Sequence, residues 1–292
     1  MRLLEILTEE PSEVVSLAQD GQRDRLMAEA STYQQLDFRG VSARDRARML
    51  EGVTRTPSHI LLRGFRPFYS TARTFPRARL VVDFCGRVDV PEDLPGRFFL
   101  GRARALCYSE KAEEILKARG ISDVTCTPGP LLPDLREGPV EDSRLVVGVI
   151  SGEDSVQALR DLLAVREKQE WRDVDIVAPH QFRGVDRVDS DMDVVECADV
   201  LIGALEREDL GEPCDAAILA AAYGRGLVAV TTSAAEKLGY TGNRYARVAK
   251  YTKGGYGAGV RLYMEHRATM AQGAPYPRPD LTVETLLRLL RE

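Results

Sequence analysis

The stretch ADVLIGALEREDLGEPCDAAILAAAYGRGLVAVTT, residues 198–232, decides the fold class of this chain. It begins with a short apolar strand at 200–202, which runs into a loop containing four acidic residues. An alanine-rich helix follows, and two glycines separate it from a second apolar strand at 227–230. Because so short and apolar a strand suits only a sheet interior, this order predicts a βαβ unit. In open parallel sheets the loops after the carboxyl ends of the strands hold the ligand.

The same pattern extends outward in both directions. Apolar runs predict further strands at 2–8, 58–62, 80–84, 103–109, 123–127, 145–150, 173–179 and 193–195. Residues 12–52 are predicted as helices separated by a polar segment, and Ser109 is a predicted N-cap of a helix that closes on Gly120. Four prolines and two glycines in 128–140 predict a linker at 128–143. We therefore expect two α/β domains, 1–133 and 142–270, and a tail helix within 271–292 that crosses back over the first domain.

Composition is ordinary for a globular protein. The chain has 292 residues, of which 44% are hydrophobic and 29% are charged. Its longest apolar run, at 216–224, is well short of the roughly 20 residues that cross a bilayer, so no membrane span is expected. The N-terminus MRLLEILTEE lacks the apolar core of a signal peptide, and five widely spaced cysteines form no CxxC pair. These features predict a cytoplasmic protein with buried thiols.

An arginine-rich segment precedes the strand at 80–84. No acid occurs between Gly52 and Val82, and arginines alternate with aromatic residues there. The arginines are Arg55, Arg63, Arg66, Arg73, Arg77 and Arg79, and the aromatic residues are Phe65, Phe68, Tyr69 and Phe75. One interpretation is a surface at 55–79 that binds phosphate, nucleic acid or a glycan. The other is a solvated helix face beside core aromatics, and the net charge of −5 argues against general affinity for nucleic acid.

Two segments resemble a known family. ARLVVDFCG (78–86) with RARALCYSEKAEEILKARGISDVTCTPGPLL (102–132) is similar to the last part of the N-terminal domain of glycosyltransferases with the GT-B fold. The stretch that begins CADVLIG, at 197–232, is similar to the donor-site segment of that family. The resemblance implies two Rossmann-like domains that face each other across a cleft, with 1–133 as the acceptor domain and 142–270 as the nucleotide-sugar donor domain. It also implies a nucleotide-diphosphate sugar as the donor substrate.

This chain departs from the family at the donor site. The family's ribose-binding glutamate aligns with Leu219, and the usual cations after the strand 145–150 are replaced by Glu153 and Asp154. Cations for a diphosphate are available downstream, in NRYARVAKYTKGGYGAGVR at 243–261. Glycines there would let backbone N–H groups approach phosphate oxygens. We therefore predict Lys250, Lys253, Gly254 and Gly255 as donor-binding residues. Arg225, in the glycine turn of the βαβ unit, is a further candidate for the same cleft, with a solvent-facing turn residue as the alternative.

Two residues are candidates for catalysis. Asp83 ends the strand at 80–84 and is expected to face the cleft as a base or acceptor-orienting group, with capping of the next turn as the alternative. His180 directly follows the strand at 173–179, at the edge where ligands bind. DSDMD at 189–193 lacks the glycine of a calcium loop, so no metal site is implied. Pro11 stands where a dinucleotide-binding domain would have its glycine-rich turn, so no such cofactor is expected.

The resulting functional hypothesis is a metal-independent glycosyltransferase. It would move a sugar from a nucleotide-diphosphate sugar to an unidentified acceptor, for which nucleic acid or a glycan at 55–79 is considered. One alternative is a glycosyltransferase-like binding or scaffold protein without catalysis. Another is a different nucleotide-sugar enzyme such as an epimerase.

Overall fold

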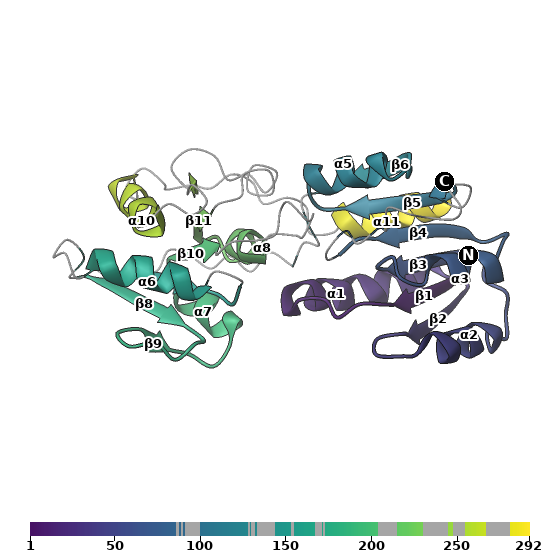
Figure 1. Ribbon diagram of the computed structural model, residues 1–292, viewed down its shortest axis with the longest axis horizontal. Helices are drawn as coiled ribbons and strands as arrows, with labels where there is room; N and C mark the ends of the chain where they lie inside the picture. Colours follow the sequence, from purple (N-terminus) through teal and green to yellow (C-terminus); the bar gives the residue numbers. More distant parts are fainter. Residues whose placement is uncertain are drawn as a thin grey trace. The chain divides into compact units, whose positions relative to one another are not determined.

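The structure is a computed structural model of the whole chain. It describes residues 1–85, 100–127, 144–152, 155–166, 173–203, 215–229, 245–247, 255–266 and 281–292, and residues 88, 90, 129, 132 and 171. The chain divides into two compact units, the first made by the N-terminal half and the C-terminal helix and the second by most of the rest (Figure 1). The predicted linker at 128–143 lies almost entirely outside the described residues.

The first unit is built on a parallel sheet of six described strands in the order β2-β1-β3-β4-β5-β6. Its elements are β1 (Arg2–Leu7), α1 (Glu13–Glu29), β2 (Thr32–Asp37), α2 (Ala43–Glu51), β3 (His59–Arg63), α3 (Phe68–Thr74), β4 (Arg79–Asp83), β5 (Ala103–Cys107), α5 (Glu110–Ala118), β6 (Asp123–Cys126) and α11 (Leu281–Arg291). Because β2 lies on one side of β1 and β3 on the other, the strand order reverses between β1 and β3. That reversal is a topological switch point, the usual ligand crevice of such a sheet.

The second unit repeats this plan with six described parallel strands in the order β12-β11-β10-β7-β8-β9. Its elements are β7 (Leu145–Val149), α6 (Ser155–Arg166), β8 (Val174–Ala178), β9 (Asp186–Arg187), α7 (Asp191–Cys197), β10 (Val200–Gly203), α8 (Asp215–Ala222), β11 (Gly226–Ala229), β12 (Tyr245–Arg247) and α10 (Gly255–His266). The switch point here lies between β7 and β10. The βαβ unit predicted from 198–232 corresponds to β10, α8 and β11, and its two strands pair in parallel.

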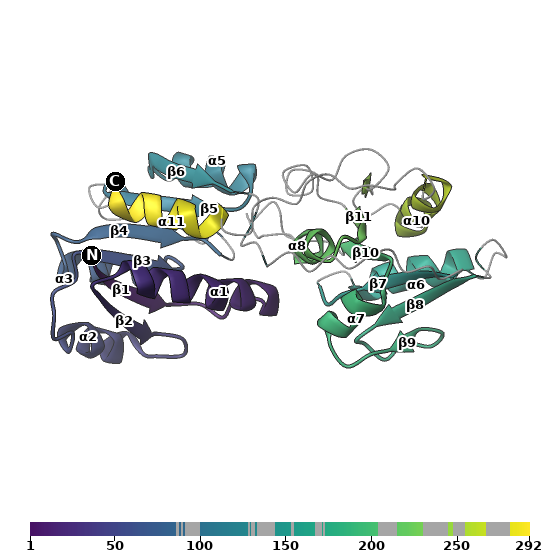
Figure 2. The same cartoon turned by 180° about the vertical axis from the view of Figure 1, so that it is seen from behind.

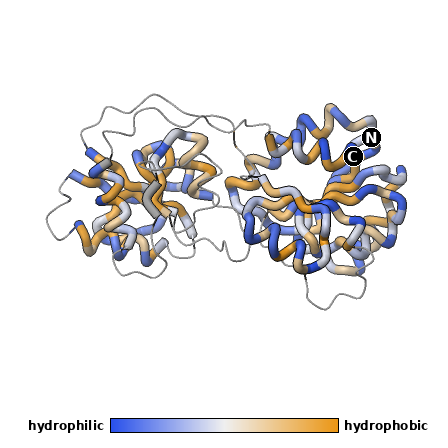
Figure 3. The backbone as a smooth tube through the Cα atoms, turned by 90° about the horizontal axis from the view of Figure 1, so that it is seen from above, coloured by the Kyte–Doolittle hydropathy of each residue, from blue (hydrophilic) through white to orange (hydrophobic). Residues whose placement is uncertain are grey.

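Helices cover both faces of the first sheet. On one face α1 and α11 pack together, and α11 contacts β3 and β4 (Figure 2). The apolar side chains of α2, α3 and α5 contribute to the core on the other face. Strands and the inward faces of the helices together form the apolar interior of each unit (Figure 3). Among the described residues, no helix combines the length and the apolar character that crossing a bilayer requires.

Local signals explain several helix ends. Ser109 accepts a hydrogen bond from the Ala112 amide at 3.0 Å, and Gly120 follows α5 with φ +95°, so both predicted ends of this helix are confirmed. Two predictions were wrong. Residues 193–195 belong to helix α7, which Ser190 caps, and not to a strand. Residues 32–37 form strand β2, where only helices and a polar segment were expected.

Candidate functional site

Three charged side chains lie within the buried strands of the first sheet. Glu5 is in the middle of β1, and Arg63 and Asp83 are the last residues of β3 and β4. Their exposed fractions are 2%, 2% and 0%. Arg63 and Asp83 are paired neighbours in the parallel register. Buried charges of this kind are stable only when they are paired and hydrogen-bonded.

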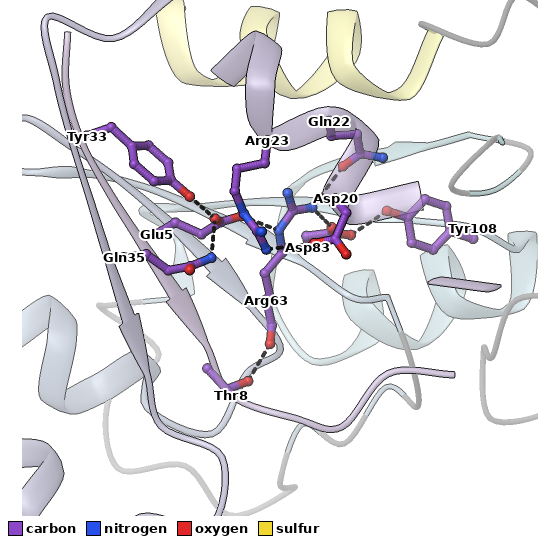
Figure 4. A network of polar contacts seen from close by, with 10 residues as sticks. All are labelled: Glu5, Thr8, Asp20, Gln22, Arg23, Tyr33, Gln35, Arg63, Asp83 and Tyr108. Atoms are coloured by element: carbon purple, nitrogen blue, oxygen red, sulfur yellow. Dashed lines mark hydrogen bonds and ion pairs between the residues drawn. The ribbon is translucent and has the colours of Figure 1, made fainter. Parts of the chain in front are cut away.

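Arg63 connects the two acids. Its Nε donates to Glu5 Oε1 at 2.8 Å, and its Nη1 donates to Asp83 Oδ2 at 2.5 Å and to Gln22 Oε1 at 3.1 Å (Figure 4). Tyr108, which directly follows β5, donates its hydroxyl proton to Asp83 Oδ1 at 2.5 Å. Side chains from three neighbouring strands, the end of a fourth and helix α1 therefore form one network. We call these five residues, Glu5, Gln22, Arg63, Asp83 and Tyr108, the buried network.

Further contacts hold this network in place. The Tyr33 hydroxyl and Gln35 Nε2, both from the edge strand β2, donate to Glu5 Oε2, the second of these at 3.0 Å. Thr8 Oγ1 donates to the backbone oxygen of Arg63 at 2.5 Å. Gly64 follows with φ +110°, and a Cβ built there would collide with Thr8 Oγ1, so this turn requires glycine. Strand β2 therefore contributes polar groups to the site as well as a sheet edge.

Burial and pairing act on the titratable groups in opposite directions. Burial raises the pKa of Asp83 above its usual range, and burial and the neighbouring Asp83 together raise the pKa of Tyr108. Burial would also raise the pKa of Glu5, but the charge of Arg63 and hydrogen bonds from Tyr33, Arg63 and Gln35 lower that pKa below its usual value. The network therefore holds an ionised Glu5 against the Arg63 guanidinium.

A pocket of about 190 Å³ opens at the switch point of this sheet. Its walls come from the carboxyl ends of β1 and β3, the loop after each of β1 and β2, and helix α1. The lining residues are Leu7, Glu9, Pro11, Ser16, Gln19, Asp20, Arg23, Arg39 and Arg63. Arg63 therefore belongs both to the buried network and to the pocket wall. We call this cavity the β1/β3 pocket.

The corresponding edge of the second sheet is arranged differently. After β7, the backbone N–H of Ser151 donates to Asp191 Oδ1 at 2.7 Å. Helices α8 and α10 begin at this same edge, because each follows a parallel strand of the sheet. Asp215, the first residue of α8, is half-buried, and Gly255, the first residue of α10, is buried. Helix N-termini favour anions. The N-termini of α8 and α10 therefore place two such positions at the carboxyl edge of the second sheet.

Comparison with known proteins identifies this architecture. No protein-family model matches the sequence, and no curated protein sequence matches it. Solved structures do match: HepE of Anabaena in complex with UDP and glucose has a TM-score of 0.64 and 11% identity, over 100% of this chain and 98% of that one. A glycosyltransferase from Rickettsia africae has a TM-score of 0.64 and 9% identity, over 99% and 96%. The chain has the GT-B fold.

A third structure shows that this fold is not confined to transferases. The UDP-GlcNAc 2-epimerase of Neisseria meningitidis, bound to UDP-GlcNAc, has a TM-score of 0.58 and 11% identity, over 100% of both chains. At these identities the likeness establishes the GT-B fold alone. The α/β class and the two Rossmann-like units predicted from the sequence are thereby confirmed.

The predicted catalytic residues occupy different environments within the GT-B fold. His180 lies two residues after β8, at the carboxyl edge of the second sheet, and is half-buried. Asp83 was expected to face a cleft, but its side chain is fully buried inside the first unit and bonded to Arg63 and Tyr108. A role for either residue in catalysis stays a prediction. The described residues contain no group of three or more potential metal ligands.

Arg225 does not lie at the ligand edge. It sits between the end of α8 and the start of β11, which is the amino edge of the sheet. Its Nη2 donates to the backbone oxygen of Glu196 near the end of α7, at 3.2 Å. The expectation that Arg225 points into the ligand cleft was therefore wrong. The physical reason is that a helix in a βαβ unit returns the chain to the edge opposite the ligand.

The predicted glycine loop is mainly a helix. Gly255, Gly257 and Gly259 lie within α10, and a Cβ built on Gly257 would collide with the Val165 side chain of α6. Gly257 therefore lets α6 and α10 approach closely. Gly255, at the helix start, remains a candidate for contact with a diphosphate. Lys250, Lys253 and Gly254 lie outside the described residues.

The arginine-rich segment divides into a core and a surface. Phe65, Phe68 and Phe75 are buried in the apolar core, and Arg63 is in the buried network. The other arginines of the segment are exposed, namely Arg55, Arg66, Arg73, Arg77 and Arg79. The burial of the three phenylalanines excludes base stacking by them. Whether the exposed arginines bind a ligand stays a prediction.

Sequence reasoning missed Glu5, Tyr108 and the role of Arg63. A signal was present, because Glu5 interrupts the apolar run RLLEIL and Arg63 ends the apolar run HILLR. Charged residues are almost never fully buried unless they are paired. Two opposite charges within or next to predicted buried strands therefore indicate a pair, although the sequence does not say which strands are neighbours.

Proposed function

We propose that this protein is a metal-independent glycosyltransferase that uses a nucleotide-diphosphate sugar. The observation that carries the proposal is the GT-B fold over essentially the whole chain. The similar structures include a glycosyltransferase from Rickettsia africae and HepE of Anabaena in complexes with UDP-glucose and with UDP and glucose. A further similar structure, the lipopolysaccharide outer core galactosyltransferase WaaB, has a TM-score of 0.58 and 14% identity, over 99% of this chain and 95% of that one.

The nucleotide would bind at the carboxyl edge of the second sheet. The turn after β7 is a poor site for a diphosphate, because the carboxylate of Asp191 already accepts the Ser151 N–H. The start of α10 is better suited, since its 12 residues direct a helix dipole toward an anion. Lys250 and Lys253 immediately precede this helix in the sequence and would add positive charge.

The positions of four further residues in the fold suggest their roles in binding the sugar donor and in the reaction. Leu219, which aligns with the family's ribose-binding glutamate, is fully buried, so ribose hydroxyls would have to bond elsewhere. Asp215, at the start of α8 on the ligand edge, is our candidate for that contact. His180 is our candidate for direct contact with the reacting sugar. Asp83, being buried, would act indirectly by holding Arg63.

Calorimetry with UDP and uridine tests the diphosphate site. The double change Lys250→Ala with Lys253→Ala should weaken UDP binding by about 2–3 kcal/mol, at about 1–1.5 per charge-assisted contact. Uridine, which lacks phosphates, should bind both proteins equally. The matched control is Lys111→Ala with Lys117→Ala, because these lysines lie on α5 in exposed pairs with Glu114 and Glu113. Unchanged UDP affinity in the first variant would remove the two lysines from the site.

A turnover assay tests the reaction itself. The protein should hydrolyse a nucleotide sugar slowly, or transfer its sugar to an acceptor, in the presence of a chelator. Activity that depends on an added divalent cation would contradict the metal-independent mechanism. Binding without any turnover, over a broad panel of donors and acceptors, would favour the scaffold alternative.

An epimerase is the second candidate. It is favoured by the likeness to the UDP-GlcNAc 2-epimerase of Neisseria meningitidis over the full length of both chains. An epimerase would invert C2 of UDP-GlcNAc without any acceptor, and a glycosyltransferase would not. Incubation with UDP-GlcNAc alone, followed by NMR of the sugar protons, separates the two reactions.

A further inference from the structure

A second pocket lies at the amino edge of the first sheet, where β1 and β2 begin (Figure 1). Its volume is about 340 Å³, and three segments line it: residues 2–4 of β1, residues 32–34 of β2, and residues 53–55 with Pro57 between α2 and β3. We call this cavity the amino-edge pocket. Because β1 spans six residues, roughly 20 Å of strand separate it from the carboxyl edge, where the β1/β3 pocket lies.

The polar side chains of this pocket have no partners among the described residues. Arg2 and Arg55 both line the pocket, and neither guanidinium forms an ion pair or a hydrogen bond within the described part of the chain. The same holds for the side chains of Thr32, Gln34 and Thr54. None of the described residues that line the pocket is acidic. Since arginine only donates hydrogen bonds and is always charged, this lining favours an anion.

Further positive charge lies along the same edge of the sheet. His59 begins β3 and is paired in the parallel register with Leu3, which lines the pocket, and with Arg79, which begins β4. Burial lowers the pKa of His59, and the positive charge of Arg79 lowers this pKa further. The acid nearest to this segment in sequence, Glu51, ends α2 and does not line the pocket. The amino edge therefore attracts negative charge.

Two arginines without partners match the charge of one phosphate monoester. Such a group carries a charge of about −1.5 to −2 at pH 7 and has three acceptor oxygens, whereas a carboxylate carries a single charge. Guanidinium groups bind phosphate through two parallel N–H···O bonds. Pockets for drug-sized ligands begin at about 300 Å³, so the cavity has room for an organic group beside the phosphate. The apolar residues Leu4, Val53 and Pro57 provide contacts for its carbon skeleton.

We propose that the amino-edge pocket binds a small phosphate monoester, carried by a sugar or a nucleoside, through Arg2 and Arg55. Both side chains are exposed, so their guanidinium groups are free to turn onto the phosphate oxygens. The hydroxyl groups of Thr32 and Thr54 donate further hydrogen bonds to the ester. This binding does not depend on the proposed transferase activity. The pocket is one strand length away from the switch-point crevice of the same sheet, so the ester is a ligand additional to any bound there.

Two double variants of equal charge test the arginines. Arg2→Gln with Arg55→Gln removes both cations of the pocket. The matched control is Arg66→Gln with Arg73→Gln, because these two arginines are also exposed and do not line the pocket. Both variants lower the net charge by the same amount, so a difference between them reports contact with the ligand and not long-range attraction.

Two nearby threonines test the cavity itself. Thr54 lines the pocket and Thr56 does not, although both are exposed. Thr54→Trp should fill the cavity, and Thr56→Trp should leave it open. The probes are glucose 6-phosphate, ribose 5-phosphate and AMP, with glucose, ribose and adenosine as their phosphate-free counterparts. Inorganic phosphate and succinate serve as anion controls.

Protein-observed NMR titration measures the affinities. At least one of the three esters should bind the wild type with a dissociation constant of about 0.1–1 mM, and its phosphate-free counterpart should bind about tenfold more weakly or worse. The double variant of Arg2 and Arg55 and the variant Thr54→Trp should each weaken ester binding by about tenfold or more, and the two controls by less than about twofold. The amide signals that shift should be those of the first residues of β1 and β2 and of 53–57. The ester that binds most tightly identifies a sugar or a nucleoside as the carrier.

Several results would overturn the proposal. They are the absence of saturable binding by all three esters, equal affinity for an ester and its phosphate-free counterpart, and tighter binding of succinate than of any ester. Equal weakening by the two double variants would show that the esters respond to the net charge of the chain and not to this pocket. Inorganic phosphate that binds as tightly as the best ester would contradict the contact between the carbon skeleton and the apolar residues of the pocket.

Discussion

The two sheets of this protein fill the space beneath their switch points in opposite ways. The first sheet places charged side chains there, with Glu5, Arg63 and Asp83 almost completely buried. The second sheet places small residues there. Gly148 lies on β7 and Gly203 ends β10, the two strands between which its order reverses. One topology is thus supported by charge pairing in one unit and by close packing in the other.

Close packing in the second unit extends beyond these two positions. A Cβ on Gly203 would lie 2.8 Å from the Ala229 side chain, and one on Gly148 would lie 2.7 Å from Val194 and Ala198. A Cβ on Gly226 would collide with the ring of Tyr263 from α10. The comparison shows that electrostatics limit substitution in the first sheet, whereas volume limits it in the second.

Removing the charge of Arg63 should have the largest effect. Arg63→Met would leave two buried carboxyl groups without their cation, and breaking a buried ion pair costs about 3–5 kcal/mol. Urea unfolding of the isolated variant should show this loss. The matched control is Arg144→Met, since Arg144 pairs with Asp175 at an exposed position of the second sheet, 3.5 Å away, and should lose at most about 1 kcal/mol. Equal losses in the two variants would contradict the comparison.

Adding one methyl group to the second sheet should cause the next largest loss of stability. In Gly148→Ala the new Cβ would lie 2.7 Å from the side chains of Val194 and Ala198 and 2.9 Å from that of Leu201. Overpacking of this kind costs about 1–3 kcal/mol. Chemical denaturation measures the change. Wild-type stability in Gly148→Ala would show that α7 moves away freely and that close packing is not what limits this sheet.

Removing the contact between Tyr33 and Glu5 should lower the free energy of unfolding by a smaller amount, and this amount should depend on pH. Tyr33→Phe removes a half-buried hydrogen bond and should cost about 1 kcal/mol at pH 7. Burial and the adjacent Glu5 raise the pKa of Tyr33, so the folded protein holds this proton after the unfolded chain has lost it. The wild-type advantage should therefore be complete below about pH 10 and should shrink as the pH rises further. Unfolding curves of both proteins between pH 7 and 11 test this, and an advantage that grows with pH would contradict it.

Replacing a glycine outside both switch points with alanine should raise the stability of the protein instead of lowering it. Gly21 lies on the exposed side of α1, and a Cβ built there would meet no atom within 4 Å. Gly21→Ala should therefore stabilise the protein by about 0.5–1 kcal/mol through helix propensity. Thermal unfolding of Gly21→Ala and Gly148→Ala shows whether the free space around the new Cβ decides if stability rises or falls. Destabilisation by Gly21→Ala would contradict that explanation.

Much of the fold could be predicted from apolar runs. The strands expected at 80–84, 145–150 and 173–179 correspond to β4, β7 and β8, because short valine-rich apolar runs favour the buried strands of a parallel sheet. Strand β2 was missed for the opposite reason. Its sequence TYQQLD is polar and it forms an edge of the sheet, so no apolar pattern marks it. Helix α7 was mistaken for a strand, since its two valines are equally compatible with either element.

The sequence by itself determined most of the elements, their order, the α/β class and the resemblance to GT-B proteins. These properties depend on local periodicity and on turn residues, which neighbours along the chain define. Only the tertiary structure decided that Arg225 lies at the amino edge and that Glu5, Arg63, Asp83 and Tyr108 form one network. The physical reason is that these contacts join residues from separate strands, and strand order and register arise only when the whole sheet has assembled.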